Sequence, residues 1–233
     1  MNSLADPVVL RHYHVRLALH QVRVGSGHPL LLLHGLGEAT RADLPPYFDE
    51  WPGPIWGLDF TGHGASSVPV GGGYTAEILL ADANVALAHI GEATVFGRGV
   101  GAWIALLLAG ARPTRVRGAI LFDGPGLVGG GTEPGSSFVI EAPAAAGGNA
   151  KLTTPDPFAV AELARDVRPP DYAASFVRFS VEGSDLPEPI TVSTVARPEW
   201  LVAVAAEPGV ADLPVEEALA LYSSSGSPSV ATT

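Results

Sequence analysis

The sequence contains no cysteine among its 233 residues, which excludes disulfide bonds, thiolate catalysis and cysteine-ligated metal sites. Basic residues are also few. The 13 Lys and Arg stand against 24 Asp and Glu, and the formal net charge is −11. This charge argues against partners that offer a phosphate backbone or an anionic surface, so we expect neither nucleic acid nor membrane as a partner. We expect no metal and, in the interpretation favoured below, no cofactor.

Long apolar runs are missing as well. The longest, at 30–33 and 102–111, fall far short of the ~20 residues that a membrane-spanning helix needs. Residues 1–9 lack the cationic start and apolar stretch of a secretory signal, so we expect a soluble, cytoplasmic protein. Hydrophobic residues nevertheless make up 47% of the chain, enough to form a core and to exclude a disordered chain.

Strand-like and helix-like patterns alternate through the first half of the chain. Residues 12–24 alternate in polarity and predict a strand, or a strand that bends into a second one. Helical spacing predicts helices at 76–90, with Thr75 as N-cap, and at 100–111, and more weakly at 43–51. Continuous apolar runs typical of buried parallel strands lie at 29–33, 54–58, 93–96 and 116–122. This order predicts an α/β fold with a mostly parallel central sheet and helices on both faces.

The pattern weakens after residue 123. Gly, Pro, Ala and Ser dominate residues 124–148, and we treat about 124–185 as a loop-rich insertion. Helix-like or strand-like patterns return at 157–166 (helix), 190–195 (strand), 198–206 (helix) and 216–222 (helix). The polar residues 223–233 are typical of a disordered tail. We therefore expect one domain over residues 1–222 with a shortened C-terminal end.

Three glycine-rich turns follow three of the predicted strands in order. They read His34-Gly35-Leu36-Gly37, Gly57-Leu58-Asp59-Phe60-Thr61-Gly62-His63-Gly64-Ala65-Ser66 and Gly97-Arg98-Gly99-Val100-Gly101. Each turn alone is a weak signal, because glycines after strands are common. Together they resemble the α/β-hydrolase superfamily over about residues 12–125: an HG oxyanion loop, a GxDxxGxGxS turn and a nucleophile elbow. The resemblance implies an α/β-hydrolase fold, a cap in place of the loop-rich insertion, and hydrolysis of esters or related acyl compounds.

The third turn departs from the superfamily at its central position. Gly97 and Gly101 supply the small residues that a tight strand-to-helix reversal needs. Gly99, however, stands where the superfamily carries Ser, or less often Asp or Cys, and glycine has no nucleophilic atom. The backbone N–H of Leu36 or Gly37 remains available in principle as an oxyanion donor.

The catalytic histidine that the superfamily places after its last strand also has no counterpart. No histidine follows His89. The position of the acid stays open between Asp123, Glu207 and Asp212. Removal of the Ser or His of a serine hydrolase costs on the order of 10⁶ in turnover, so we expect that Ser-His-Asp catalysis cannot operate here.

We therefore interpret the chain as a non-classical or catalytically inactive hydrolase-fold protein that binds a small anionic or acyl molecule. The missing side chain at Gly99 would leave space in the floor of a pocket. The candidate ligand-binding residues lie in the first and third turns: Gly35, Leu36, Gly37, Arg98 and Val100. Arg98 has an alternative role as the partner of Glu38, Asp59 or Asp123.

Two other functions stay open. An early histidine, His34 or His63, or the carboxylate of Asp123, would act as a general base without a covalent intermediate. Alternatively, the two histidines only hold their turns by hydrogen bonds. The run Gly97-x-Gly99-x-x-Ala102 also matches the dinucleotide-binding fingerprint, with Asp123 near the position of a ribose-binding acid. That reading leaves the two upstream turns unexplained.

Overall fold

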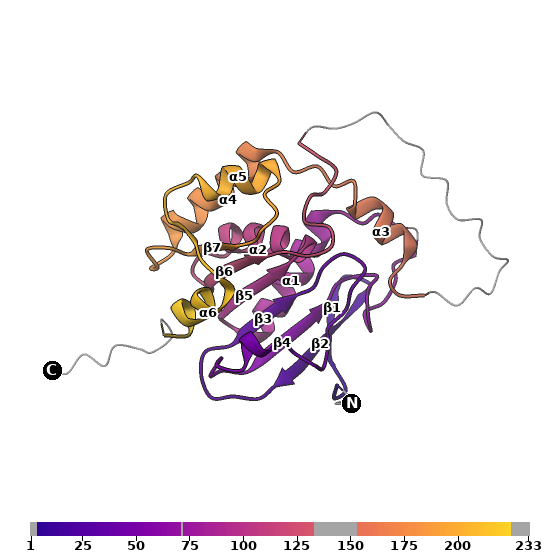
Figure 1. Cartoon of the computed structure of the whole chain (residues 1–233). Coiled ribbons are helices and arrows are strands. Elements are labelled where there is room, and N and C mark those ends of the chain that lie inside the picture. The colour runs from indigo at the N-terminus through magenta and orange to yellow at the C-terminus, as the bar shows by residue number, and fades with distance from the viewer. Residues whose placement is uncertain (1–3, 71, 133–152, 225–233) are drawn as a thin grey trace.

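A computed structural model describes residues 4–70, 72–132 and 153–224 (Figure 1). Its strands form one sheet in the order β1-β2-β4-β3-β5-β6-β7-β8. Their bounds are β1 (Val8–His12), β2 (Val15–Arg23), β3 (Leu30–Leu33), β4 (Ile55–Asp59), β5 (Ala93–Arg98), β6 (Val116–Phe122), β7 (Ile190–Ser193) and β8 (Val210–Asp212). β2 pairs antiparallel with β1 and β4, and every other pair is parallel. The predicted mostly parallel sheet is confirmed.

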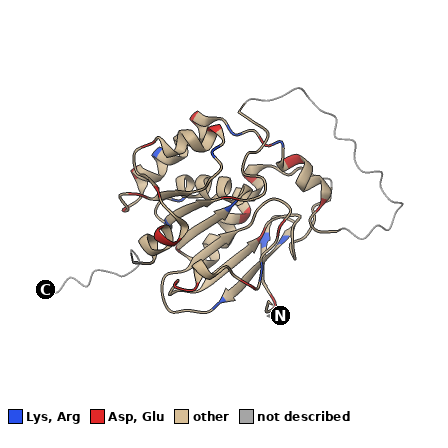
Figure 2. Cartoon of the chain, viewed as in Figure 1, with Lys and Arg blue, Asp and Glu red and all other residues tan. Residues whose placement is uncertain are grey.

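Helices cover both faces of this sheet, but unequally. The bounds are α1 (Ala76–Ile90), α2 (Val100–Ala111), α3 (Pro157–Leu163), α4 (Pro170–Gly183), α5 (Glu199–Ala205), α6 (Val215–Ser224) and the 3₁₀ helix η1 (Pro46–Phe48). α1 and α2 pack on one face, with α4 over α2 and α5 against α4 (Figure 1). Among the described residues, the other face carries only α6 and η1. Asp and Glu lie on several of the helices, including the first turn of α6 (Figure 2).

The central elements agree with the sequence. α1 and α2 have the predicted bounds, and the Thr75 hydroxyl accepts the N–H of Ile78 as an N-cap. α2 is buried along nearly its whole length because it lies between the sheet and α4. No helix within the described residues is long and apolar enough to cross a membrane.

Two predictions in the first half were wrong in detail. The strand predicted at 12–24 forms as β2 but begins only at Val15, because the chain reverses at Tyr13, whose φ is 51° and whose side chain is 88% exposed. β1 and β2 are therefore a hairpin. The weak helix expected at 43–51 is reduced to η1, because Pro45 and Pro46 remove two backbone donors from it.

The C-terminal half is more regular than expected. The segment predicted as loop-rich, 124–185, contains the expected α3 and also α4, whose buried residues are mainly small ones. The strand β8 was also missed. The sheet nevertheless ends in short strands, with four residues in β7 and three in β8. Residues 133–152 of the loop-rich segment and 225–233 of the expected tail lie outside the described residues, and Ser223 belongs to α6.

Candidate functional site

The third glycine-rich turn is a tight reversal from β5 into α2. Gly99 sits at the bend with φ 60° and ψ −120°, in the left-handed half of backbone space that favours glycine. A Cβ on Gly97 would overlap the backbone of Gly101, and a Cβ on Gly101 would overlap the carbonyl of Leu33. The three glycines therefore allow β3, β5 and α2 to approach closely at this point.

The place of this turn in the sheet identifies the architecture. β5 lies between β3 and β6 among the parallel strands, so the turn after β3, which begins at His34, lies beside the turn at Gly99. A strand, an elbow and a helix at the centre of a mostly parallel eight-stranded sheet are the arrangement that the three motifs imply. By its strand order and by the turn that joins β5 to α2, the chain has the α/β-hydrolase fold. The Ser-to-Gly difference thus lies in an intact elbow.

Comparison with known proteins gives matches among solved structures only. No family model matches the sequence, and no curated protein sequence matches it. The matching structures include the enol-lactonase from Burkholderia xenovorans LB400 (19% identity, TM-score 0.42, 49% of this chain and 46% of that chain). They also include an alpha/beta hydrolase from Sphaerobacter thermophilus DSM 20745 (24% identity, TM-score 0.42, 49% of this chain and 44% of that chain). A third is an esterase from Exiguobacterium antarcticum (22% identity, TM-score 0.41, 49% of this chain and 44% of that chain). The match spans less than half the length of each of these chains.

The second glycine-rich turn is organised around Asp59. Its carboxylate accepts the N–H groups of Thr40 at 2.7 Å and Ala65 at 2.8 Å, and it lies 3.1 Å from Nε2 of His20. Burial alone would raise the pKa of this carboxyl, but the hydrogen bonds from His20 and the two amides lower it below its ordinary value. A Cβ on Gly64 would overlap the same carboxylate. Asp59 therefore stabilises its own loop through these hydrogen bonds.

The backbone donors of the first and third turns already have an acceptor. The carbonyl oxygen of Pro125 accepts the N–H of Leu36 at 2.9 Å and the N–H of Val100 at 3.0 Å. Gly35 donates its N–H to the Glu38 carboxylate at 3.0 Å, and Gly37 donates to Nε2 of His63 at 3.3 Å. The four candidate backbone contacts to a ligand are thus engaged within the chain.

The space expected at Gly99 is also filled, and that expectation was wrong. A Cβ built on Gly99 would overlap the carbonyl oxygen of Pro125 and the carbonyl carbon of Gly124. The segment after β6 therefore occupies the volume that a nucleophile side chain would need. We call residues 124–131 the closing segment.

The closing segment is fixed in place by buried side chains. The carbonyl oxygen of Leu127 accepts Nη1 of Arg168 at 2.5 Å and Nε1 of Trp200 at 2.9 Å. The Arg168 guanidinium is completely buried and lies 5.4 Å from the ring centroid of Trp103 and 5.9 Å from that of Trp200. Burial lowers the pKa of Arg168 to about 10, which leaves it charged at neutral pH. Gly130 adds a hydrogen bond from its N–H to the carbonyl of Asp166.

His34 and His63 both use their two ring nitrogens on backbone groups. Nδ1 of His34 donates to its neighbour Gly35 at 2.8 Å, and Nε2 accepts the N–H of Phe60 at 3.1 Å. Nδ1 of His63 donates to the carbonyl of Thr61 at 3.1 Å, and its Nε2 accepts from Gly37. These bonds require neutral rings, and burial together with the nearby His63 lowers the pKa of His34 to about 4. Burial lowers the pKa of His63 as well.

The three candidate acids also have partners away from Gly99. Asp123 accepts the N–H groups of Val195 and Ala196, at 2.6 and 3.1 Å, and so ties the end of β6 to the loop after β7. The other two acids form exposed ion pairs, Glu207 with Arg178 and Asp212 with Arg197. Among the described residues, no cluster of three or more His, Asp or Glu could hold a metal ion.

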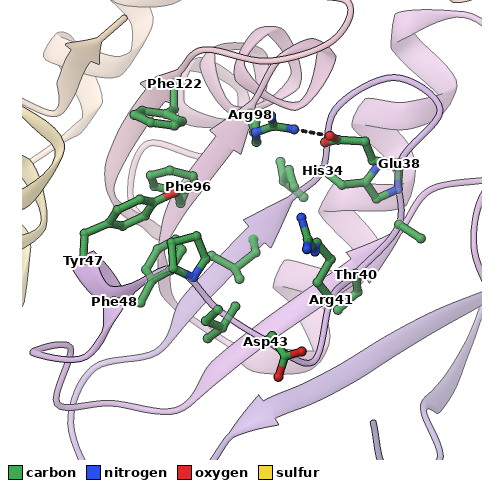
Figure 3. A pocket seen from close by; sticks show the side chains of 15 residues that line it. His34, Glu38, Thr40, Arg41, Asp43, Tyr47, Phe48, Phe96, Arg98 and Phe122 are labelled. Atoms are coloured by element: carbon green, nitrogen blue, oxygen red, sulfur yellow. Dashed lines mark hydrogen bonds and ion pairs between the residues drawn. The ribbon is translucent and has the colours of Figure 1, made fainter. Parts of the chain in front are cut away.

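Arg98 is the one proposed ligand contact whose side chain lines a cavity. It forms an ion pair with Glu38 at the rim, which confirms one of its three expected partners (Figure 3). The cavity lies on the α6 face of the sheet, and its aromatic side chains, such as Phe96 and Phe122, were not proposed from the sequence. The sequence does indicate that Phe96 and Arg98 share a face of the sheet, because they are two residues apart on one strand.

Proposed function

We propose that this protein is a catalytically inactive member of the α/β-hydrolase fold that binds a small ligand. The observation that carries the proposal is the position of the Pro125 carbonyl. Hydrolases of this fold direct the N–H after the nucleophile and an N–H of the loop after the third strand at the oxyanion. The corresponding groups here, on Val100 and Leu36, are both donated to Pro125.

Within the described residues, the candidates for the remaining catalytic roles are engaged in other contacts. Gly99 offers no nucleophile. His34 and His63 could accept a proton only by giving up a hydrogen bond from a backbone N–H. This arrangement supports a binding role over a general-base enzyme built on these histidines.

The contacts of the elbow also argue against dinucleotide binding. A pyrophosphate would need free N–H groups at the start of α2, but those of Gly99 and Val100 are bonded to Phe122 and Pro125. Both carboxylate oxygens of Asp123 accept backbone N–H groups, so this residue is not free to bind a ribose.

A panel of short-chain nitrophenyl esters tests the proposal. The purified wild-type protein is compared with a His34→Asn, His63→Asn double variant whose fold is checked by circular dichroism. We expect rates indistinguishable from buffer for both proteins. Turnover that co-purifies with the wild-type protein and falls at least about tenfold in the folded variant would overturn the proposal, because it would establish non-triad catalysis.

A further inference from the structure

A cavity of about 470 Å³ lies where the sheet is poorly covered. The crossover from β3 to β4 contains only η1, which spans three residues, and no longer helix in the described part of the chain packs over this part of the α6 face. The cavity lies at the carboxyl ends of β3, β5 and β6, and the loop after β3 brings Glu38 and Tyr47 to opposite sides of it (Figure 3). Its volume falls in the range of small-ligand sites.

Aromatic rings line one side of the cavity. Phe96 on β5 and Phe122 on β6 have ring centroids 5.3 Å apart, and Tyr47 reaches them from the loop, at 6.1 Å from Phe96 and 5.8 Å from Phe122. The rings of Tyr47 and Phe96 are nearly parallel, with an interplanar angle of 29°. The three rings offer flat apolar surface to a planar ligand.

A guanidinium lies next to these rings. Arg98 pairs with Phe122 in the parallel register of β5 and β6, so the two side chains leave the same face in the same row. Within the described residues, the only hydrogen bond of the Arg98 side chain goes from Nη1 to Glu38. Its other N–H groups remain available, and a guanidinium binds a planar carboxylate with two parallel hydrogen bonds.

The neighbouring charges favour a monoanion. Glu38 is held by Arg98 and by the N–H of Gly35, and Asp43 lies at the opposite end of the cavity from Arg98 (Figure 3). Arg41 also lines the cavity, so two cations and two carboxylates surround it. A dianionic phosphate gains little net Coulomb energy from this balanced set, and its second charge costs more desolvation than the single charge of a carboxylate.

We propose that this cavity binds a small aromatic carboxylate, with the ring against Phe96 and Phe122 and the carboxylate on Arg98. The inference names the ligand class for the binding role proposed above. It places the ligand on the α6 face of the sheet, against the Arg98 side chain of the elbow, and not at the position of Gly99 that Pro125 fills.

Titration calorimetry with matched ligands tests this inference. 1-Naphthoate is compared with the neutral 1-naphthamide, which has the same ring, and with 1-naphthyl phosphate, a dianion. We expect wild-type protein to bind the carboxylate at least about tenfold more tightly than the amide or the phosphate. Equal affinity for carboxylate and amide, tighter binding of the phosphate, or no binding in the millimolar range would overturn the inference.

Variants of the cavity locate the ligand. Arg98→Met should remove the preference for the carboxylate and change the affinity for the amide less than about threefold, whereas Phe122→Ala should weaken both ligands alike. Arg98→Lys keeps the positive charge but loses the planar guanidinium that makes two parallel hydrogen bonds. It should therefore also lose most of the preference for the carboxylate over the amide. Arg178→Met, which breaks an exposed ion pair elsewhere, is the matched control and should change nothing. A carboxylate preference that survives both Arg98 variants would overturn the assignment.

These experiments distinguish a failure of the ligand assignment from a failure of the proposed function. Ester hydrolysis by a protein that also binds 1-naphthoate through Arg98 would overturn the inactivity alone. A protein that neither hydrolyses esters nor discriminates between the naphthyl ligands would overturn only the ligand class.

Discussion

The N–H of Val100 and the carbonyl oxygen of Pro125 are 3.0 Å apart, and this hydrogen bond joins the start of α2 to the segment after β6. The same oxygen accepts the N–H of Leu36. The close approach requires glycine at position 99, because any Cβ there would overlap the Pro125 carbonyl. Glycine at position 99 and the engagement of the Leu36 and Val100 N–H groups by Pro125 are therefore one structural feature. A side chain at position 99 would clash with Pro125 in its present place. A Pro125 carbonyl moved away would leave the N–H groups of Leu36 and Val100 without this acceptor.

Restoring serine at the elbow is expected to damage the fold without restoring catalysis. Gly99→Ser should lower the free energy of unfolding by about 2–4 kcal/mol, through positive-φ strain and the clash with Pro125, and should give no esterase activity. Denaturant unfolding and the nitrophenyl ester assay measure the two effects. Gly73→Ser is the matched control: Gly73 has φ 88° but no heavy atom near its Cβ position, so it should cost only about 1 kcal/mol. An equal loss of unfolding free energy in the two variants would mean that Pro125 can shift away from a side chain at position 99 at little cost.

Amide hydrogen exchange tests how firmly the closing segment is held. The N–H groups of Leu36 and Val100 should be protected in the wild-type protein, because both donate to Pro125. Arg168→Met removes a hydrogen bond to Leu127 and should speed exchange at both amides by about tenfold, which corresponds to ~1.4 kcal/mol of opening free energy.

The control for this experiment is Arg178→Met. Arg178 is an exposed residue of α4 paired with Glu207, so its loss should leave the two amides protected. Rapid exchange of Leu36 and Val100 in the wild-type protein would instead show that these two N–H groups are open to a ligand.

Much of the fold was predictable because side chains carried the signal. The apolar run of α2, the strand–turn order and the glycines at 97, 99 and 101 are together enough to predict the elbow. The Asp59 turn was predictable for the same reason, since an Asp among glycines is typical of a loop that satisfies its own backbone.

The closing segment was not predictable, because its decisive group is a backbone carbonyl. Every residue has a carbonyl, and only the tertiary position of Pro125 distinguishes this one. α4 was missed for a different reason. Its buried face consists of Ala173, Ala174, Val177 and Ser180, and small residues give a weak helical pattern. β8 was missed because three residues carry almost no periodicity.

Asp123 is expected to stabilise the structure and to play no part in chemistry. Asp123→Ala should lower the free energy of unfolding by about 1–2 kcal/mol, because water replaces two charge-assisted hydrogen bonds from the N–H groups of Val195 and Ala196. Asp212→Ala breaks an exposed ion pair and should cost no more than ~1 kcal/mol. Chemical denaturation of both variants measures the difference. A smaller loss at Asp123 than at Asp212 would contradict this role.

His34 should make the protein sensitive to acid. The folded-state pKa of about 4 lies below the ordinary value of 6.5, so the unfolded chain binds more protons between these two pH values. The contribution of the neutral ring is therefore fully present above pH 6.5 and is lost as the pH falls toward 4. The loss amounts to about 3 kcal/mol for a shift of this size.

A comparison with His34→Asn isolates this effect from other titrating groups. The free energy of unfolding is measured from pH 7 to 4 for both proteins. The wild type should lose about 3 kcal/mol more than the variant over this range, because asparagine does not titrate. The NMR signals of the His34 ring should also show no titration above about pH 5. Parallel curves, or a ring that titrates near pH 6.5, would mean that His34 is open to solvent and free to accept a proton, which is the property a general base requires.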